Sequence, residues 1–549
     1  MGQPGPRVSH TEILLLAALA AWGLFPLVLL LVHAGQTHAQ FTGADGLIGA
    51  DGVLGADQLQ YLAWSRDAAA HGLASDLFSL SPSGHVYLEP IFTIVGGLYR
   101  IGLSLPLAYL LFKPIAILAL ALAAVAWARR TVPDQLGARA AVVALSLFLY
   151  TPLAALFSWT QLGSGSFRFS LYLLADELLA ANKLWGYVPS AIGLALLPVA
   201  LLAIERALDP GRDAVLAGRA GSSASGRAAR RPVIVAALAS LMACWLHPWQ
   251  GITLILIFVG LAVLSRLRHW LALAVPAVAA ALPLGYYYLL SHSDPAWKLA
   301  SRYEVIPRLP ALVLLAGLGP LALIAAFGVR RPRGEMIEQA LLLWIGACLV
   351  TYFINDSFAP HALQGLSLPL AVLAVRGFQR LRLPRPLAVS LGVVAIGVLT
   401  VPGLAYDARK FVNTARNTRL VQYYLPRPDA RALDWVSHQA PPGGVLAATP
   451  FAVVVPAQTG RAVWVGHGYW SRDYLGHARQ ADALFSGRMK PGAARAFVER
   501  TGATMLVADC RHRADLTRPL GPMIATVHRF GCARVFVLVQ AQRGRSARR

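Results

Sequence analysis

Runs of Leu, Ala, Val and Ile recur along the first four hundred residues, with short polar or proline-rich breaks between them. A helix needs about 20 apolar residues to cross the hydrocarbon core of a bilayer. The ten-residue alternation of a spanning β-barrel is absent. The pattern therefore predicts a polytopic α-helical membrane protein with about 11–13 spans. The clearest runs cover residues 12–33, 106–128, 140–157, 185–205, 232–247, 249–264, 270–291, 309–329, 337–355, 362–376 and 387–404.

Three of these stretches need separate interpretation. The first run, from Thr11 to Val32, follows a single base and lacks a small-residue cleavage site, so we interpret it as a retained signal anchor. Residues 88–104 are apolar but short, and we expect an embedded or tilted helix there. The hairpin 232–265 is short for two crossings. Its apex at residues 246–251 is therefore expected below the outer surface, facing protein or a watery cavity.

Arginines cluster between the runs and set the expected topology. The chain is 56% hydrophobic and 14% charged, yet its net charge is +23. By the positive-inside rule, five arginine clusters facing the cytoplasm place the N-terminus inside and residues 406–549 outside. The charge thus reports topology, and no nucleic-acid partner is expected. The clusters contain Arg129, Arg130 and Arg139; Arg206, Arg212, Arg219, Arg227, Arg230 and Arg231; Arg266 and Arg268; Arg330, Arg331 and Arg333; and Arg376, Arg380, Arg382 and Arg385.

The chain is predicted to consist of a transmembrane domain, residues 1–405, and an extracytoplasmic domain, residues 406–549. Outer loops are expected at 34–87 and 158–184, and a flexible cytoplasmic linker at 211–231. In the second domain, a helical pattern at 430–439 and a strand pattern at 444–449 precede further segments at 462–465, 491–500, 504–508 and 533–539. Strands alternating with helices predict a small α/β sandwich. The Arg- and Ala-rich composition is typical of a multi-pass protein of a bacterial plasma membrane.

The four cysteines fall into two pairs. Cys244 and Cys348 lie in predicted spans, where a buried apolar role is expected. Cys510 and Cys532 share the extracytoplasmic domain, and either a disulfide or two free thiols is compatible with the sequence.

The first outer loop contains the candidate chemistry. Gly-Ala-Asp recurs every six residues at Asp45, Asp51 and Asp57, and a helical pattern begins at the third copy. The spacing i, i+4, i+7 places Asp57, Tyr61 and Trp64 on one helical face. A simpler interpretation stays open, in which Asp57 caps the helix and the other two aspartates belong to glycine turns.

The Asp57-x-x-x-Tyr61 opening, in a large loop after the first span, resembles the GT-C fold glycosyltransferases. That superfamily includes protein O-mannosyltransferases, aminoarabinose transferases of lipid A and oligosaccharyltransferase catalytic subunits. The segment Gly84-His85-Val86-Tyr87-Leu88-Glu89-Pro90 stands where many members have His-Pro-Pro. The helix around Trp435, the strand at Val445, Thr459-Gly460-Arg461 and Gly466-His467-Gly468-Tyr469-Trp470 are similar to tails of the superfamily.

The resemblance implies transfer of a sugar from a polyprenyl-phosphate-linked donor to an acceptor hydroxyl at the outer membrane face. The acceptor would be a lipid, a protein or a cell-envelope glycan. A phosphate leaving group needs no protonating acid, so one carboxylate base and a group that holds the phosphate suffice. Asp57 is the expected base. Many members pair two acidic residues here, but Gln58 follows Asp57, so Asp51, Asp67 or Glu89 is left as the second carboxylate.

Outer polar residues are candidates for binding the substrate, namely Tyr61, Arg66, Glu89, His247, Arg302 and His361. The adjacent pair Asp176-Glu177 does not face one way on a helix, which disfavours a metal site built from it alone. No cofactor is expected: a divalent metal is compatible with the resemblance, but no Cys/His ligand spacing indicates one. The absence of Walker and Rossmann glycine patterns disfavours a soluble nucleotide donor. Two alternatives remain: a transporter or flippase of lipid-linked saccharides, and a noncatalytic glycan-binding relative.

Overall fold

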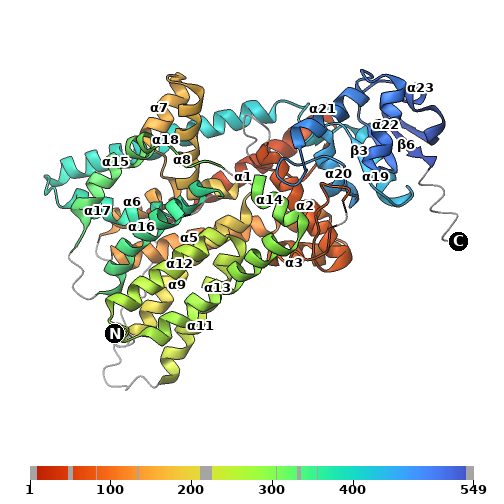
Figure 1. Cartoon of the computed structure of the whole chain (residues 1–549). Helices are drawn as coiled ribbons and strands as arrows, with labels where there is room; N and C mark the ends of the chain where they lie inside the picture. Colours follow the sequence, from red (N-terminus) through yellow and green to blue (C-terminus); the bar gives the residue numbers. More distant parts are fainter. Residues whose placement is uncertain are drawn as a thin grey trace. The chain divides into compact units, whose positions relative to one another are not determined.

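The computed structural model describes residues 9–46, 53–81, 83–132, 135–209, 226–303, 306–330, 335–354 and 357–539 (Figure 1). The chain divides into two units, which are described separately. The first unit contains residues 1–24, 113–288 and 305–410. The second unit contains residues 25–112, 289–304 and 411–549, so it gathers most of the first loop with the C-terminal part of the chain.

Within the described residues, seven helical segments are long and apolar enough to cross a bilayer. They are α1 (His10–Thr37), α4–α5 (Leu105–Leu110 and Phe112–Thr131), α9 (Val188–Leu208), α13 (Trp270–Ser293), α15 (Ala311–Gly328), α16 (Met336–Ile354) and α18 (Arg385–Ala415). The pair α6 (Leu136–Phe148) and α7 (Pro152–Thr160) passes the same test but bends by 49°. The prediction of a polytopic α-helical membrane protein is confirmed.

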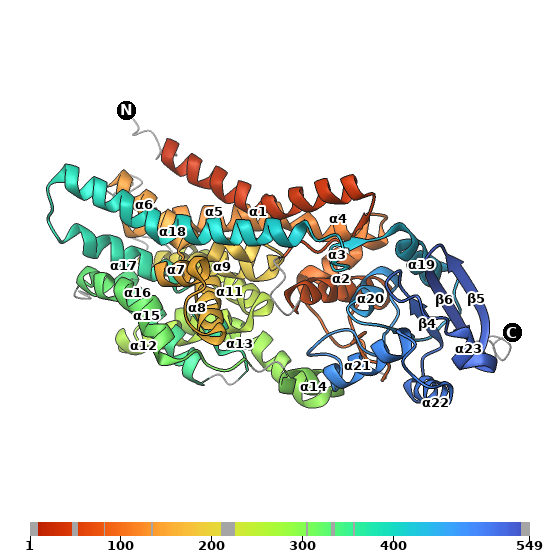
Figure 2. The same ribbon diagram turned by 90° about the horizontal axis from the view of Figure 1, so that it is seen from above.

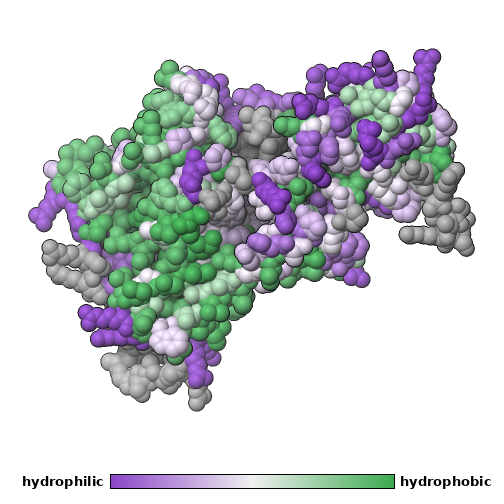
Figure 3. Space-filling view, in the orientation of Figure 1, coloured by the Kyte–Doolittle hydropathy of each residue, from purple (hydrophilic) through white to green (hydrophobic). Residues whose placement is uncertain are grey.

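The surface of these helices is apolar where lipid would contact it. Large apolar side chains are exposed along α13 and α15, among them Val275, Val278, Leu282, Leu312 and Leu315. Figure 3 shows a broad hydrophobic face over the helices of the first unit. Contact between so many exposed leucine and valine side chains and water is unfavourable, whereas contact with lipid chains is not.

The number of crossings differs from the expected eleven. Three predicted runs, 232–247, 249–264 and 362–376, correspond to α11 (Gly226–Leu246), α12 (Pro248–Leu264) and α17 (Ser367–Gln379). These helices are not among the candidate spans: α12 and α17 have only 17 and 13 residues, and α11 begins in an arginine-rich stretch. By length and composition, the described residues thus contain seven candidate spans, or eight if the bent pair α6–α7 is one span.

Several shorter elements connect the spans. They are α2 (Val53–His71), α3 (Pro90–Arg100), α8 (Gly165–Leu178), η1 (Ala180–Leu184), α14 (Pro295–Tyr303) and η2 (Ala359–Leu363). Residues 88–104 contain the short helix α3, as expected for a segment too short to cross. Most of the predicted linker 211–231 lies outside the described residues.

Close helix packing in the first unit depends on small residues. Helices α9, α11 and α12 pack together (Figure 1), and α15 crosses α17 at Gly328 and Gly377. A Cβ added at Gly328 would overlap the carbonyl of Leu373, and one at Gly377 would overlap that of Ile324. Contact between the two backbones therefore requires glycine on both helices. Buried Arg376 pairs with Glu338 at 2.7 Å near the end of α17.

The C-terminal part of the second unit is an α/β layer structure, which confirms the predicted class. Four strands have the order β3 (Val445–Ala447), β4 (Met505–Ala508), β6 (Ala533–Leu538) and β5 (Ile524–Phe530), with only β3 and β4 parallel. The helices α21 (Tyr474–Phe485) and α22 (Pro491–Thr501) cover one face, and α19 (Arg427–His438) covers the other (Figure 2). The remaining elements are η3 (Phe451–Val453), α20 (Val454–Thr459), α23 (Thr517–Leu520) and η4 (Gly521–Met523).

Some details of this layer differ from the sequence pattern. Residues 462–465 form no strand and make only an isolated bridge between Val445 and Val463. Strand β5 has no counterpart in the prediction, and its residues are half-buried or exposed, without a fully buried face. Cys510 and Cys532 form a disulfide.

A short strand pair ties the first loop to this region of the second unit. The strand β1 (Gln40–Phe41) pairs antiparallel with β2 (Tyr424–Leu425). Helix α20 packs against α2 in the same unit. Segments of the first loop and of the C-terminal region thus form one folded body, in which the candidate base lies.

Candidate functional site

Asp57 lies in the second turn of α2 and is held by a histidine from the C-terminal region. The helix begins at Val53, so the interpretation of Asp57 as its cap is wrong. Oδ1 of Asp57 lies 3.0 Å from Nε2 of His467, whose side chain is 1% exposed, whereas that of Asp57 is 20% exposed. Nδ1 of His467 accepts the backbone N–H of Tyr469 at 3.2 Å. A neutral imidazole that accepts at Nδ1 bears its proton on Nε2, so His467 donates to the carboxylate.

The loop that carries His467 is fixed by a buried serine. Oγ of Ser471 accepts the backbone N–H groups of Gly466 and His467 at 3.0 and 3.2 Å. The same hydroxyl donates to the carbonyl of Phe78 at 2.7 Å. A side chain at Gly466 would press on the ring of Phe78, which requires glycine at this approach. Two loops of the second unit therefore hold the imidazole in one orientation, and the imidazole orients Asp57.

Aromatic side chains gather on the same helix. Tyr61 stacks on Phe92 with ring centroids 4.9 Å apart. Trp64 packs against Tyr87 at 4.6 Å. Two tryptophans from other segments join this cluster. The ring centroid of Trp470 lies 5.2 Å and that of Trp297 6.0 Å from the ring centroid of Trp64. The helix that presents Asp57 is therefore anchored in a rigid aromatic wall, in which Trp64, Tyr87, Phe92 and Trp470 are buried and Tyr61 and Trp297 are half-buried.

The predicted binding residue Arg66 has a structural role in this geometry. Its Nε donates to the carbonyl of Ala457 at 2.9 Å, and its guanidinium lies over the ring of Tyr99. Burial lowers the pKa of Arg66 from its ordinary value. The side chain also lines a hollow of about 620 Å³ with Arg427 and Arg431, which makes that hollow cationic.

Glu89 begins α3 and is buried. Its carboxyl accepts the backbone N–H of Phe92 at 2.7 Å, which caps the helix. Burial raises the pKa of Glu89 to about 8, so the group is largely neutral at pH 7. A neutral carboxyl is a poor second base. Of the other carboxylates, Asp51 lies outside the described residues, and Asp67 contacts two histidines instead.

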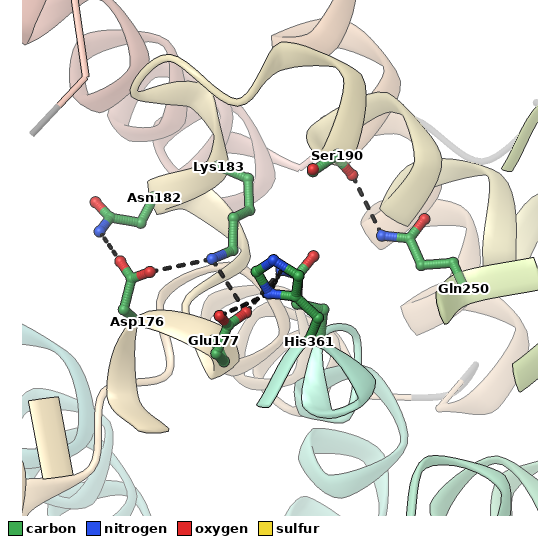
Figure 4. A network of polar contacts seen from close by, with 8 residues as sticks. Asp176, Glu177, Asn182, Lys183, Ser190, Gln250 and His361 are labelled. Atoms are coloured by element: carbon green, nitrogen blue, oxygen red, sulfur yellow. Dashed lines mark hydrogen bonds and ion pairs between the residues drawn. The ribbon is translucent and has the colours of Figure 1, made fainter. Parts of the chain in front are cut away.

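A second constellation, in the first unit, contains His361 (Figure 4), and the other histidine named from the sequence, His247, lies beside it. Oε1 of Glu177 lies 2.9 Å from Nδ1 of His361, and Oε2 accepts from Gln364 at 2.6 Å. Lys183 reaches from η1 to both acidic residues, 3.3 Å from Glu177 and 3.1 Å from Asp176. The adjacent carboxylates, which cannot face each other on α8, are thus joined by one ammonium group.

The charges of this constellation support one another. Burial alone would raise the pKa of Glu177, but the charges and hydrogen bonds of Lys183 and His361 hold it well below the ordinary range. Burial would lower the pKa of Lys183, but Asp176 and Glu177 raise it. The ring of His247 lies 5.2 Å from that of His361. Both histidines therefore border a buried ion pair, which stays charged at neutral pH.

The remaining predicted residue, Arg302, is exposed on α14. Sequence reasoning gave no role to His467 or Glu177, and it named Lys183 only among the outer bases available to a donor phosphate. The sequence signal for His467 was its position between two glycines and next to Tyr469 and Trp470. The signal for Glu177 and Lys183 was an acidic pair six residues before a lysine in a predicted outer loop.

No family model and no curated protein sequence matches this chain. Solved structures that are similar to it include the apo oligosaccharyltransferase of Archaeoglobus fulgidus, with 14% identity and a TM-score of 0.44 over 94% of this chain and 73% of that one. ArnT from Cupriavidus metallidurans, also apo, has 15% identity and a TM-score of 0.44 over 96% and 97%. At these identities and scores, the similarity establishes neither activity nor substrate.

Proposed function

We propose that the protein is a membrane glycosyltransferase in which Asp57 is the general base. The donor is a polyprenyl-phosphate-linked sugar, and the acceptor is a hydroxyl of a lipid, a protein or an envelope glycan. The observation that carries the proposal is the partly exposed Asp57 carboxylate, which accepts a hydrogen bond from the buried His467. A carboxylate fixed in orientation and open to solvent on one side is suited to receiving a proton from a bound hydroxyl.

The reaction is a single displacement at the anomeric carbon. As the acceptor oxygen forms its bond to that carbon, its proton passes to the Asp57 carboxylate. The bond between the carbon and the phosphate oxygen breaks, and polyprenyl phosphate leaves with the electron pair. The leaving group is stable as an anion, so no acid must protonate it. One displacement inverts the configuration at the anomeric carbon.

The donor phosphate needs a cation or hydrogen-bond donors, and Arg302 is the residue we propose for it. Arg302 is exposed on α14, in the same unit as Asp57. Its planar guanidinium binds phosphate oxygens in pairs. Tyr61 and Trp297, the half-buried members of the aromatic wall, are proposed to contact the sugar.

The outer membrane face is the proposed place of the reaction. The disulfide between Cys510 and Cys532 supports an oxidising compartment for the C-terminal region. The positive-inside rule assigns the same side to that region from the sequence. A donor attached to a membrane-embedded polyprenyl chain remains within reach of a loop that follows the first span.

The test is transfer of radiolabelled sugar from a panel of polyprenyl-phosphate donors, with the full chain in lipid nanodiscs. Asp57→Asn keeps the shape and the hydrogen bond acceptor but removes the base, so transfer should fall by about 10²–10⁴-fold. Asp434→Asn is the matched control, because Asp434 also pairs with a histidine, His438, yet is exposed on α19. It should transfer at the unchanged rate.

Equal rates for Asp57→Asn and the unchanged chain would refute the base assignment. Absence of transfer with every donor, together with retained saccharide binding, would refute the enzymatic proposal. That outcome would favour a carrier of lipid-linked saccharides or a glycan-binding protein.

A further inference from the structure

A histidine pair and an aspartate converge at the C-terminal end of α2, outside the groups used above. Nδ1 of His71 lies 2.9 Å from Oδ1 of Asp67, and Nδ1 of His85 lies 3.0 Å from Oδ2 of the same residue. Asp67 and His71 are four residues apart, so they share one face of the helix. His85 comes from the loop between α2 and α3. Asp67 is 4% exposed, while the histidines are 49% and 38% exposed and thus accessible from solvent.

The two histidine rings lie against each other, and the Nδ1 atom of each contacts a different oxygen of the same carboxylate. The imidazoles of His71 and His85 stack with centroids 3.7 Å apart and planes at 22°. Their ligand atoms and that of Asp67 lie within 4.8 Å of one another. In a tetrahedral zinc site with bonds of about 2.0–2.1 Å, neighbouring ligand atoms are about 3.4 Å apart. The separations between the histidine nitrogens and the carboxylate oxygens, 2.9 and 3.0 Å, are slightly shorter than this, and one ring must also turn out of the stack for both nitrogens to point at an ion.

We propose that Asp67, His71 and His85 bind a divalent transition-metal ion, with Zn²⁺ as the best match. Two imidazoles and one carboxylate are ligands that zinc prefers, whereas Mg²⁺ and Ca²⁺ require more oxygen ligands. The ion replaces the hydrogen-bonding protons between the rings and the carboxylate. Water fills the remaining coordination positions, since both histidines face solvent.

Outer hydrogen bonds already fix the carboxylate. The backbone N–H and the hydroxyl of Ser75 donate to Oδ2 of Asp67 at 2.7 and 2.8 Å. Such partners orient a ligand before the ion arrives and strengthen binding. Ala74 and Tyr87 exchange two backbone hydrogen bonds of 3.0 Å, which close the loop between them. The ion therefore sits at the base of a closed loop and joins it to α2.

The position along the helix separates this ion from the proposed base. Asp67 follows Asp57 by ten positions in the same helix, which corresponds to about 15 Å at about 1.5 Å per residue. One ion cannot bind both carboxylates. Its role is to position the loop, which carries Tyr87 into the aromatic wall beside Trp64.

The first experiment measures metal binding to the full chain, purified without a polyhistidine tag and stripped with a chelator. Titration with Zn²⁺ should show one equivalent bound, and Co²⁺ should give the visible absorption of a tetrahedral or five-coordinate site. His71→Asn and His85→Asn should each weaken Zn²⁺ binding by at least about 10–100-fold, the loss typical of an outer partner alone. His438→Asn is the matched control, because His438 also pairs with an aspartate four residues away but has no second histidine.

Unchanged binding in both ligand variants would overturn the proposal, as would a stripped chain that binds no stoichiometric Zn²⁺. Asp67, His71 and His85 would then form a hydrogen-bonded cluster that binds no metal ion. If either ligand variant fails to fold, Ser75→Ala replaces it and should weaken binding about tenfold; unaltered affinity there would also overturn the proposal.

Hydrogen exchange gives a readout that is independent of transfer activity. Zn²⁺ should slow amide exchange in residues 73–81 and 83–89 of the unchanged chain and leave that of His71→Asn unaltered. Equal slowing in both proteins would place the ion elsewhere. Because neither measurement uses a sugar donor, the metal proposal and the transferase proposal succeed or fail separately.

Discussion

Replacing Lys183 by Met tests whether the buried constellation of the first unit is held by charge. Lys183 is 5% exposed and Glu177 2% exposed, so loss of the ammonium leaves a carboxylate without access to water. Breaking a buried ion pair by removing one partner costs about 3–5 kcal/mol of unfolding free energy. Glu177 keeps its contacts to His361 and Gln364, and Asp176 is 24% exposed and hydrated. The expected loss is therefore at the lower end, about 3 kcal/mol.

The double variant Glu177→Gln with Lys183→Met separates charge from shape. Removing both charges leaves no uncompensated ion, so most of the lost stability should return. The pKa of Glu177 is held below its ordinary value, so its contribution is present above about pH 4.5 and is lost as the pH falls. The gap between the unchanged chain and Lys183→Met should accordingly narrow below about pH 4.5.

The assay is denaturant unfolding in mixed micelles, followed by tryptophan fluorescence at several pH values. Lys298→Met, which removes an exposed lysine of α14, is the control and should change stability by less than about 0.5 kcal/mol. The reasoning is refuted if Lys183→Met is as stable as the unchanged chain, or if the double variant is less stable than the single one.

Three further results follow from the structure. His467→Ala should lower kcat of sugar transfer by about 100-fold with little change in KM, because a misplaced Asp57 slows chemistry and not binding; His467→Gln, which keeps a donor, should restore part of it. Burial, together with the charge of Asp509, raises the pKa of Asp429 to about 7, so stability from this group is present at acidic pH and is lost as the pH rises through about 7. Asp429→Asn should then stabilise the protein at pH 8, by at most about 4 kcal/mol of unfolding free energy, and should have little effect at pH 4. The thermal unfolding midpoint should accordingly rise at pH 8 only. Gly377→Ala should destabilise the first unit by about 1–3 kcal/mol or more in the same unfolding assay, since its Cβ overlaps the carbonyl of Ile324, whereas Gly319→Ala, which meets nothing within 4 Å, should not.

The helices of this protein follow from local sequence to a large extent. The predicted runs 270–291 and 337–355 differ by at most two residues at either end from α13 and α16, because apolar length alone defines a bilayer crossing. The apolar run 362–376 corresponds to α17, a helix of 13 residues that is apolar and largely buried within the protein. Strand β5, which has no fully buried face, gave no clear alternating pattern.

The sites depend on contacts that local sequence does not encode. Asp57 stood out through its repeat and helical spacing, but its partner His467 lies 410 residues away in the chain. Glu177 and His361 are separated by 184 residues. His85 follows His71 after a loop whose length matches no common ligand spacing, so the cluster with Asp67 was missed. Such pairs appear only when the fold brings distant segments together.

The separation between Asp57 and His467 also has a consequence for biosynthesis. Ribosomes add about 5–20 residues per second, so roughly 20–80 s pass between the synthesis of the aspartate and that of the histidine. All the candidate spans after α1 are made during this interval, and β1 likewise waits for β2. A nascent or truncated chain therefore carries an unoriented carboxylate, and Asp57 is oriented only when the segment that carries His467 has been made and has folded.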